Sequence, residues 1–167
     1  MILIGQYDSP FVRRVGLALA HYGLAFQHRP RSAFGDREKL AELNPLLRVP
    51  TLVTPEGDVL TDSHVVLAHV DGLVAPARVM LPADRDARRR ALAAIGLAPG
   101  LADLAVGLFY EIRLHEQRSD FLLERRRAQI AAALAALDRT AGAHERPHLF
   151  GDRLTHADTA LAAALGA

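Results

Sequence analysis

The chain has 167 residues, half of them apolar, and this combination predicts one sizeable hydrophobic core or two small ones rather than a disordered segment. Twenty basic and nineteen acidic residues leave a formal charge of +1, so no net field favours nucleic acid or an anionic membrane as a partner. The chain contains no cysteine, which excludes disulfide scaffolds, thiolate metal sites and Cys-x-x-Cys redox chemistry. Any reactive thiol must therefore come from a ligand.

The start of the chain does not have the form of a targeting segment. Its apolar residues 1–4 are interrupted by Gly5, Gln6 and Asp8, and the run is too short for a secretory signal peptide. No uninterrupted apolar run approaches the roughly 18 residues that a membrane-spanning helix needs. We therefore expect a soluble, cytoplasmic protein with no membrane partner.

Short strands and helices alternate over the first seventy residues. The expected elements are a strand at 1–6, a helix opened by Ser9-Pro10 and ended by Gly23, a strand at 25–29, a helix at 36–43, a hairpin of strands 50–54 and 59–61, and a helix capped by Asp62-Ser63 that reaches about residue 70. Ser is a good N-cap, and Pro at the first helical position loses no hydrogen bond. The order β-α-β-α-β-β-α predicts an α/β domain over residues 1–71, whose helices pack on its sheet.

Residues 72–83 are interpreted as a linker between domains. They hold Gly72, Pro76 and Pro82 and show no helical periodicity. Beyond them, residues 84–167 are expected to form a second, helical domain. Pro99-Gly100 is expected to break or kink a helix just upstream of a leucine repeat.

Two further helices are expected near the end of the chain. Ser119 caps one that continues to Gly142. Residues 155–158, Thr-His-Ala-Asp, have the form of a capping box with Asp in place of the usual Glu or Gln. This box predicts the start of a last helix that contains Leu161 and Leu165.

Three segments of the first domain coincide, in order and spacing, with motifs of the glutathione transferases. The first, Ser9-Pro10-Phe11-Val12-Arg13, resembles the active-site motif of the serine-type, bacterial-like members. The second, Asn44-Pro45-Leu46-Leu47-Arg48-Val49-Pro50, is similar to the family's Asn-Pro-x-Gly-Lys-Val-Pro run. The third, Asp62-Ser63, matches the family's acidic-Ser pair. Residues 154–158 add a match to the buried N-cap of the family's second domain.

This resemblance implies a thioredoxin-like N-terminal domain followed by an all-α C-terminal domain. Members usually continue for several tens of residues after the capped helix, so the C-terminal domain that ends at Ala167 is expected to be truncated. The sequence also departs from the family at Leu47, which stands where the family has glycine. Either the backbone does not need a positive φ at this position, or it tolerates one at a cost.

Ser9 is the residue that the resemblance assigns to activating the thiol of glutathione. A thiol with a pKa of about 8.5 is only about 3 % thiolate at pH 7, and a hydroxyl donor and a helix N-terminus both favour the anion. A charge-assisted hydrogen bond of roughly 1.5 to 3 kcal/mol lowers the pKa by about one to two units, which raises the thiolate fraction roughly tenfold or more. Tyr7 is the alternative donor, since other branches of the family use a tyrosine at the end of the first strand, and Ser9 would then only cap its helix.

The remaining glutathione-binding residues follow from the other two motifs. The resemblance implies that Asp62 holds the ammonium group of the γ-glutamyl end and that Ser63 holds its carboxylate; ordinary helix capping is the alternative. It also implies that the backbone of Val49 pairs with glutathione and that Pro50 follows a cis peptide bond. Arg48 is suited to a glutathione carboxylate, or it is plain surface charge.

Residues 144–148 spell His-Glu-Arg-Pro-His, the H-E-x-x-H pattern of zinc proteases. That signature requires a helix, which Pro147 forbids, and no third ligand is apparent in the sequence. We therefore expect no metal, and glutathione is the one cofactor, as a co-substrate.

The predicted function is conjugation of glutathione to small, apolar electrophiles, or a related glutathione-dependent reaction. The resemblance also implies a homodimer. A non-catalytic glutathione transferase-like module that binds a partner is the alternative, which the truncation and Leu47 favour.

Overall fold

A computed structural model describes residues 1–142 and 147–166 of the chain. The chain divides into two compact units, residues 1–80 and 81–167, and each is described by itself. The first unit contains the sheet, and the second, over its described residues, consists of helices with one isolated β-bridge between His148 and Gly151. The elements follow the predicted order, and the architecture is a thioredoxin-like domain followed by a helical domain.

The sheet of the first unit has four short strands: β1 (Ile2–Ile4), β2 (Gln27–Arg29), β3 (Thr51–Val53) and β4 (Val59–Thr61). Their order in the sheet is β2-β1-β3-β4. Strand β1 pairs parallel with β2 and antiparallel with β3, and β4 closes the hairpin with β3. The inner strand β1 therefore connects the parallel half of the sheet to the antiparallel half.

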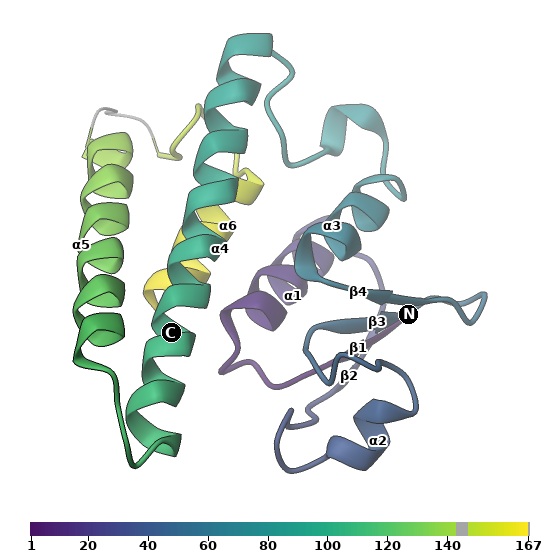
Figure 1. Ribbon diagram of the computed structural model, residues 1–167. Helices are drawn as coiled ribbons and strands as arrows, with labels where there is room; N and C mark the ends of the chain where they lie inside the picture. Colours follow the sequence, from purple (N-terminus) through teal and green to yellow (C-terminus); the bar gives the residue numbers. More distant parts are fainter. Residues whose placement is uncertain (143–146, 167) are drawn as a thin grey trace. The chain divides into compact units, whose positions relative to one another are not determined.

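Three helices belong to this unit: α1 (Pro10–Tyr22), α2 (Arg37–Ala41) and α3 (Ser63–Asp71). Helix α1 begins after its N-cap Ser9 and ends at Gly23, which takes the left-handed conformation (φ 68°) that glycine adopts without a steric penalty. Helices α1 and α3 pack against each other on one face of the sheet, with α2 toward the other (Figure 1). Their apolar faces and the sheet bury a common set of side chains: Leu3, Ile4, Val12, Val15, Leu19, Leu52, Val66 and Val70.

The segment that follows α3 is fixed to the same unit by Tyr22. The Tyr22 hydroxyl donates to Asp71 Oδ1 (2.5 Å) and accepts from the backbone N–H of Met80 (2.7 Å). Arg78, at the end of a short 3₁₀-helix (Pro76–Arg78), donates to the Tyr22 carbonyl (2.8 Å). These bonds hold residues 72–80 against the end of α1, so the segment expected as a linker lies largely within the first unit.

The second unit consists of α4 (Arg85–Leu114), α5 (Asp120–Gly142) and α6 (His156–Leu165). Helix α4 packs against both α5 and α6 (Figure 1). It runs without interruption through Pro99, so the break, one of the two outcomes expected at Pro99-Gly100, is wrong, and the kink stays a prediction. Proline removes one hydrogen bond from the helix, but Ala98, Pro99 and Leu101 are buried, and tertiary packing of an apolar face outweighs such a local penalty.

Helix α4 is also long and apolar enough to cross a membrane by length and composition alone. Its most apolar stretch of 18 residues has a mean hydropathy of 1.8, and 33 % of that stretch is buried within the protein. Core helices of soluble proteins have the same properties. Here the buried residues of α4 include Ala94 and Ile95, which form an apolar cluster with Ala157 of α6.

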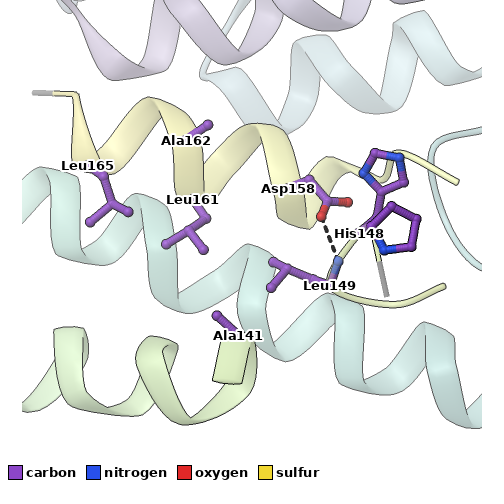
Figure 2. A pocket seen from close by; sticks show the side chains of 8 residues that line it. Ala141, His148, Leu149, Asp158, Leu161, Ala162 and Leu165 are labelled. Carbon is purple, nitrogen blue, oxygen red and sulfur yellow. Dashed lines mark hydrogen bonds between the residues drawn. The ribbon is translucent and has the colours of Figure 1, made fainter. Parts of the chain in front are cut away.

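Asp158 organises the entry to α6. Its carboxylate accepts from the backbone N–H of Thr155 (2.7 Å), from the Thr155 hydroxyl (2.7 Å) and from the backbone N–H of Leu149 (2.8 Å). The first of these bonds belongs to the predicted capping box, which is present. The bond to Leu149 (Figure 2) fixes the preceding loop, whose Leu149 and Phe150 pack on the cluster around Ile95.

We expect Asp158→Ala to lower the free energy of unfolding by about 2 to 4 kcal/mol, because it leaves the donors of Thr155 and Leu149 without their acceptor. Urea denaturation followed by circular dichroism measures the change. Asp152→Ala is the matched control, because Asp152 is exposed and lies in the same loop, and it should change stability by less than about 0.5 kcal/mol. Equal effects of the two substitutions would contradict this account of α6.

Candidate functional site

Ser9 lies at the N-terminus of α1, with its hydroxyl available to a ligand. Its side-chain oxygen accepts a long hydrogen bond from the backbone N–H of Val12 (3.4 Å). Because the oxygen acts here as an acceptor, the hydroxyl hydrogen remains free to be donated. The first turn of α1 contains no acidic residue, and Asp8, directly before the N-cap, is exposed to solvent, where its charge is screened. A donor and a positive helix end therefore coincide at Ser9.

Tyr7, the alternative donor, lies against the side of α1. Its ring stacks on His28 with centroids 4.1 Å apart, and it is 41 % exposed. A Cβ placed on Gly16 would lie 2.6 Å from Tyr7 Cε1 and 2.8 Å from its hydroxyl oxygen. Gly16 is six residues beyond the first residue of α1, which is about 9 Å along the helix. The Tyr7 hydroxyl thus lies beside the middle of α1, and burial raises its pKa.

Asn44 fixes the loop that leads into β3. It is fully buried; its amide donates to the Arg48 carbonyl (2.9 Å) and to Thr51 Oγ1 (3.0 Å), and its side-chain oxygen accepts from the backbone N–H of Leu46 (3.0 Å). Thr51 Oγ1 in turn donates to the Arg48 carbonyl (3.1 Å). These bonds close the loop on itself and determine its backbone.

The backbone of this loop resolves the question raised by Leu47. Leu47 has a φ of 53°, so the loop does require a positive φ where the family has glycine, and this chain tolerates it in a leucine. The Val49–Pro50 peptide bond is cis, as predicted. Arg48 is exposed, whereas Val49 lies against Gly5, where an added Cβ would be 2.8 Å from Val49 Cβ and 2.5 Å from Val12 Cγ2. Residue 49 is therefore held close to the first turn of α1.

Asp62 and Ser63 begin α3. Asp62 is the N-cap, with an unusual φ of 71°, and its carboxylate accepts from the backbone N–H of His64 (2.7 Å). Ser63 is the first helical residue and is buried. Asp62 is exposed, whereas Ser63, the next residue, is buried.

Arg14 is a residue of this region that the sequence motifs did not reveal. It is 2 % exposed and donates from Nη1 to Ser63 Oγ (3.4 Å). Loss of hydration lowers the pKa of the Arg14 guanidinium to about 10. The negative charge of Asp62 acts in the opposite direction and raises this pKa, but its effect is the smaller of the two. The sequence did contain one signal of its burial, the spacing of four residues that places Arg14 on the same face of α1 as Ala18 and Tyr22, which are both buried.

The structure thus assembles the three predicted segments around the first half of α1. The loop before β3 meets Gly5 and Val12, and the start of α3 meets Arg14. The described residues contain no group of three or more His, Cys, Asp or Glu side chains placed to hold a metal. Within the H-E-x-x-H pattern, residues 144–146 lie outside the described part of the chain.

The second unit has two adjoining cavities of about 360 and 400 Å³. Both are lined by Ala141 at the end of α5 and by Leu161 and Leu165 of α6. Figure 2 shows the first of the two. Leu165 is 61 % exposed. The two leucines predicted for the last helix therefore border an apolar groove.

Both halves of the chain match known domain families. Residues 8–73 match the glutathione S-transferase N-terminal domain, and residues 120–167 match the glutathione S-transferase C-terminal domain. The GST-like protein YibF of Escherichia coli (strain K12) is 34% identical over 140 residues, which are 83% of this chain and 68% of that protein. The chain therefore belongs to the glutathione S-transferase family of enzymes, which confirms the predicted family.

Solved structures agree in fold. A glutathione S-transferase from Methylobacillus flagellatus KT, with glutathione bound, superposes with a TM-score of 0.88 at 25% identity, over 98% of this chain and 80% of that one. A second, from Methylobacterium radiotolerans in complex with glutathione sulfonate, gives a TM-score of 0.89 at 31% identity, over 98% and 76% of the two chains. The predicted two-domain fold is confirmed, while the serine type and the truncation stay predictions.

We expect Leu47→Gly to raise the free energy of unfolding by about 0.5 to 1 kcal/mol, because glycine adopts the left-handed conformation without the penalty that a leucine carries there. Leu46→Gly is the control, since Leu46 is exposed and lacks a positive φ, and it should lower stability by about the same amount. Urea denaturation of both variants makes the comparison. If the two substitutions destabilise the protein equally, Leu47 is not strained.

Proposed function

We propose that the first unit binds glutathione and that Ser9 holds its sulfur as the thiolate, which attacks a small, apolar electrophile. The observation that carries this proposal is the position of Ser9, where a free hydroxyl hydrogen and the N-terminus of a helix whose first turn has no acidic residue act on the same point. The two relatives solved with glutathione and with glutathione sulfonate support this ligand. The position of Tyr7 beside the middle of α1 favours Ser9 over Tyr7 as the thiol's donor.

The other site residues bind the ends of the ligand. Asp62 takes the ammonium group of the γ-glutamyl end, and Ser63 takes its carboxylate at the N-terminus of α3. The backbone of Val49 pairs with the middle of glutathione, in the loop that precedes the cis Pro50. Arg48, which is exposed, is suited to a second carboxylate. No metal takes part, and the protein acts in the cytoplasm.

The transfer step is a nucleophilic attack. The thiolate sulfur forms a bond to the electrophilic atom of the second substrate, whose leaving group departs with its electron pair or whose double bond accepts the pair and then a proton. Ser9 contributes by stabilising the thiolate before the attack. A lower thiol pKa raises the thiolate fraction while reducing its intrinsic nucleophilicity, so the net gain is smaller than the change in fraction.

We expect Ser9→Ala to lower kcat for a standard conjugation reaction by about ten- to a hundredfold and to leave the Kd for glutathione nearly unchanged, because the lost bond acts on the thiolate. Asp62→Ala is the opposite case and should mainly raise that Kd. Steady-state kinetics and calorimetric titration separate the two effects. Unchanged turnover in Ser9→Ala would move the role to Tyr7 or to backbone N–H donors, and binding without any turnover in the unaltered protein would select the non-catalytic alternative.

We also propose that the chain forms a homodimer, as its family resemblance implies. The apolar groove that Leu161 and Leu165 border is a face that a second chain can cover. Light scattering at micromolar concentration should therefore give a molecular mass twice that of the 18.1 kDa chain. A stable monomer that does not bind a hydrophobic dye would contradict this proposal.

A further inference from the structure

The side chain of His28 holds the segment that joins β1 to α1. His28 lies in the edge strand β2, in register with Leu3 of β1, and its Nε2 is 2.7 Å from the carbonyl oxygen of Gly5. A carbonyl oxygen only accepts hydrogen bonds, so Nε2 carries the hydrogen and donates it. An imidazole with a hydrogen on Nε2 donates this bond whether the ring is neutral or charged, so the contact does not depend on the protonation state of His28.

Gly5 is the residue at which the chain leaves the sheet. Its backbone N–H still donates to the Arg29 carbonyl of β2 (3.0 Å), but its φ of 132° turns the chain away from the strand. Other residues rarely adopt this conformation, whereas glycine is free to adopt it among many others. The bond from His28 therefore restrains a carbonyl whose orientation residue 5 does not fix by itself.

The turn between Gly5 and Ser9 is short. The backbone N–H of Ser9 donates to the Gln6 carbonyl (3.2 Å), which closes a turn over residues 6–9. Within this turn the Tyr7 ring stacks on the ring of His28. His28 thus contacts the backbone just before the turn and a side chain within it. A displacement of Gly5 is passed on to Ser9, because only residues 6–8 lie between them.

We propose that His28 is a positioning residue for Ser9: its bond to the Gly5 carbonyl sets the turn that aims the Ser9 hydroxyl at the sulfur of glutathione. Hydrogen bonds weaken steeply as their geometry departs from linear, so a small rotation of the turn reduces the stabilisation of the thiolate. His28 acts through the backbone and takes no part in the attack itself. This inference rests on the proposed function, because it assumes that Ser9 donates to the thiol of glutathione.

The test measures kcat/KM for the electrophile with glutathione saturating, because its pH dependence reports the pKa of the thiol in the binary complex. His28→Ala should raise this pKa by about half to one unit, so that kcat/KM falls about three- to tenfold near pH 6 and converges on the unaltered value near pH 9, where the thiol is ionised in both proteins. The protonated thiol does not need the Ser9 bond, so the Kd for glutathione near pH 6, measured by calorimetric titration, should stay within about twofold.

Two further variants separate the hydrogen bond of His28 from its ring stack. His28→Gln keeps an amide donor for the Gly5 carbonyl and should restore the unaltered pH profile to within about twofold. His28→Phe keeps a ring that can stack on Tyr7 but has no donor, so it should behave like His28→Ala. His21→Ala is the matched control, since His21 is exposed in the last turn of α1, and it should leave the profile unchanged.

Melting temperatures establish that each variant is folded, and the Gln and Phe variants carry the test if His28→Ala is not. An unchanged profile in His28→Ala, a loss of kcat/KM that is equal at every pH, or identical profiles for the Gln and Phe variants would overturn the inference. If the unaltered protein itself fails to lower the thiol pKa below its usual value of about 8.5, the proposed role of Ser9 is wrong and this inference fails with it. The profile of the unaltered protein therefore distinguishes the two failures.

Discussion

The buried side chain of Asn44 is the constraint on which the candidate site depends. Its three hydrogen bonds are all made within residues 44–51, so one side chain closes the whole loop before β3. A buried amide is stable only when such partners are present, which makes this loop geometry strongly preferred over alternatives. The same geometry forces Leu47 into the left-handed region and brings Val49 against Gly5. The hydrogen bonds of Asn44 thus stabilise the loop in a conformation that strains the backbone at Leu47.

Helix α1 connects this loop to the other elements of the candidate site. Its N-cap Ser9 lies at one end, and Arg14, five residues further on, reaches Ser63 at the start of α3. Five residues of helix span about 7.5 Å, so the proposed thiol and carboxylate positions are separated along a rigid element. In the proposed site, rigid placement of this kind holds the γ-glutamyl end and the central cysteine of the tripeptide, which reduces the orientational freedom of the thiol before the attack.

Much of the fold could be predicted because its signals are local. Three short motifs each predict the start of a helix from a few neighbouring residues: Ser9-Pro10, Asp62-Ser63 and the Thr155–Asp158 capping box. In the structure, α1, α3 and α6 begin at these positions. Pro99 misled the prediction because its cost is local, whereas the packing of α4 on α5 and α6 that overrides it joins distant parts of the chain. Arg14 was missed for the same reason, since its partner Ser63 is 49 residues away.

The same distinction applies within the candidate site. Sequence spacing identified the residues that cap or end an element, and it left Tyr7 and Ser9 as rival donors because both lie between β1 and α1. What separates them is a tertiary contact: the absence of a side chain at Gly16 lets the Tyr7 ring lie against α1 and stack on His28. Gly16 therefore bears on the proposed thiol site without belonging to it, because it provides the space that holds Tyr7 beside the middle of α1, away from Ser9 at the N-terminus of the helix.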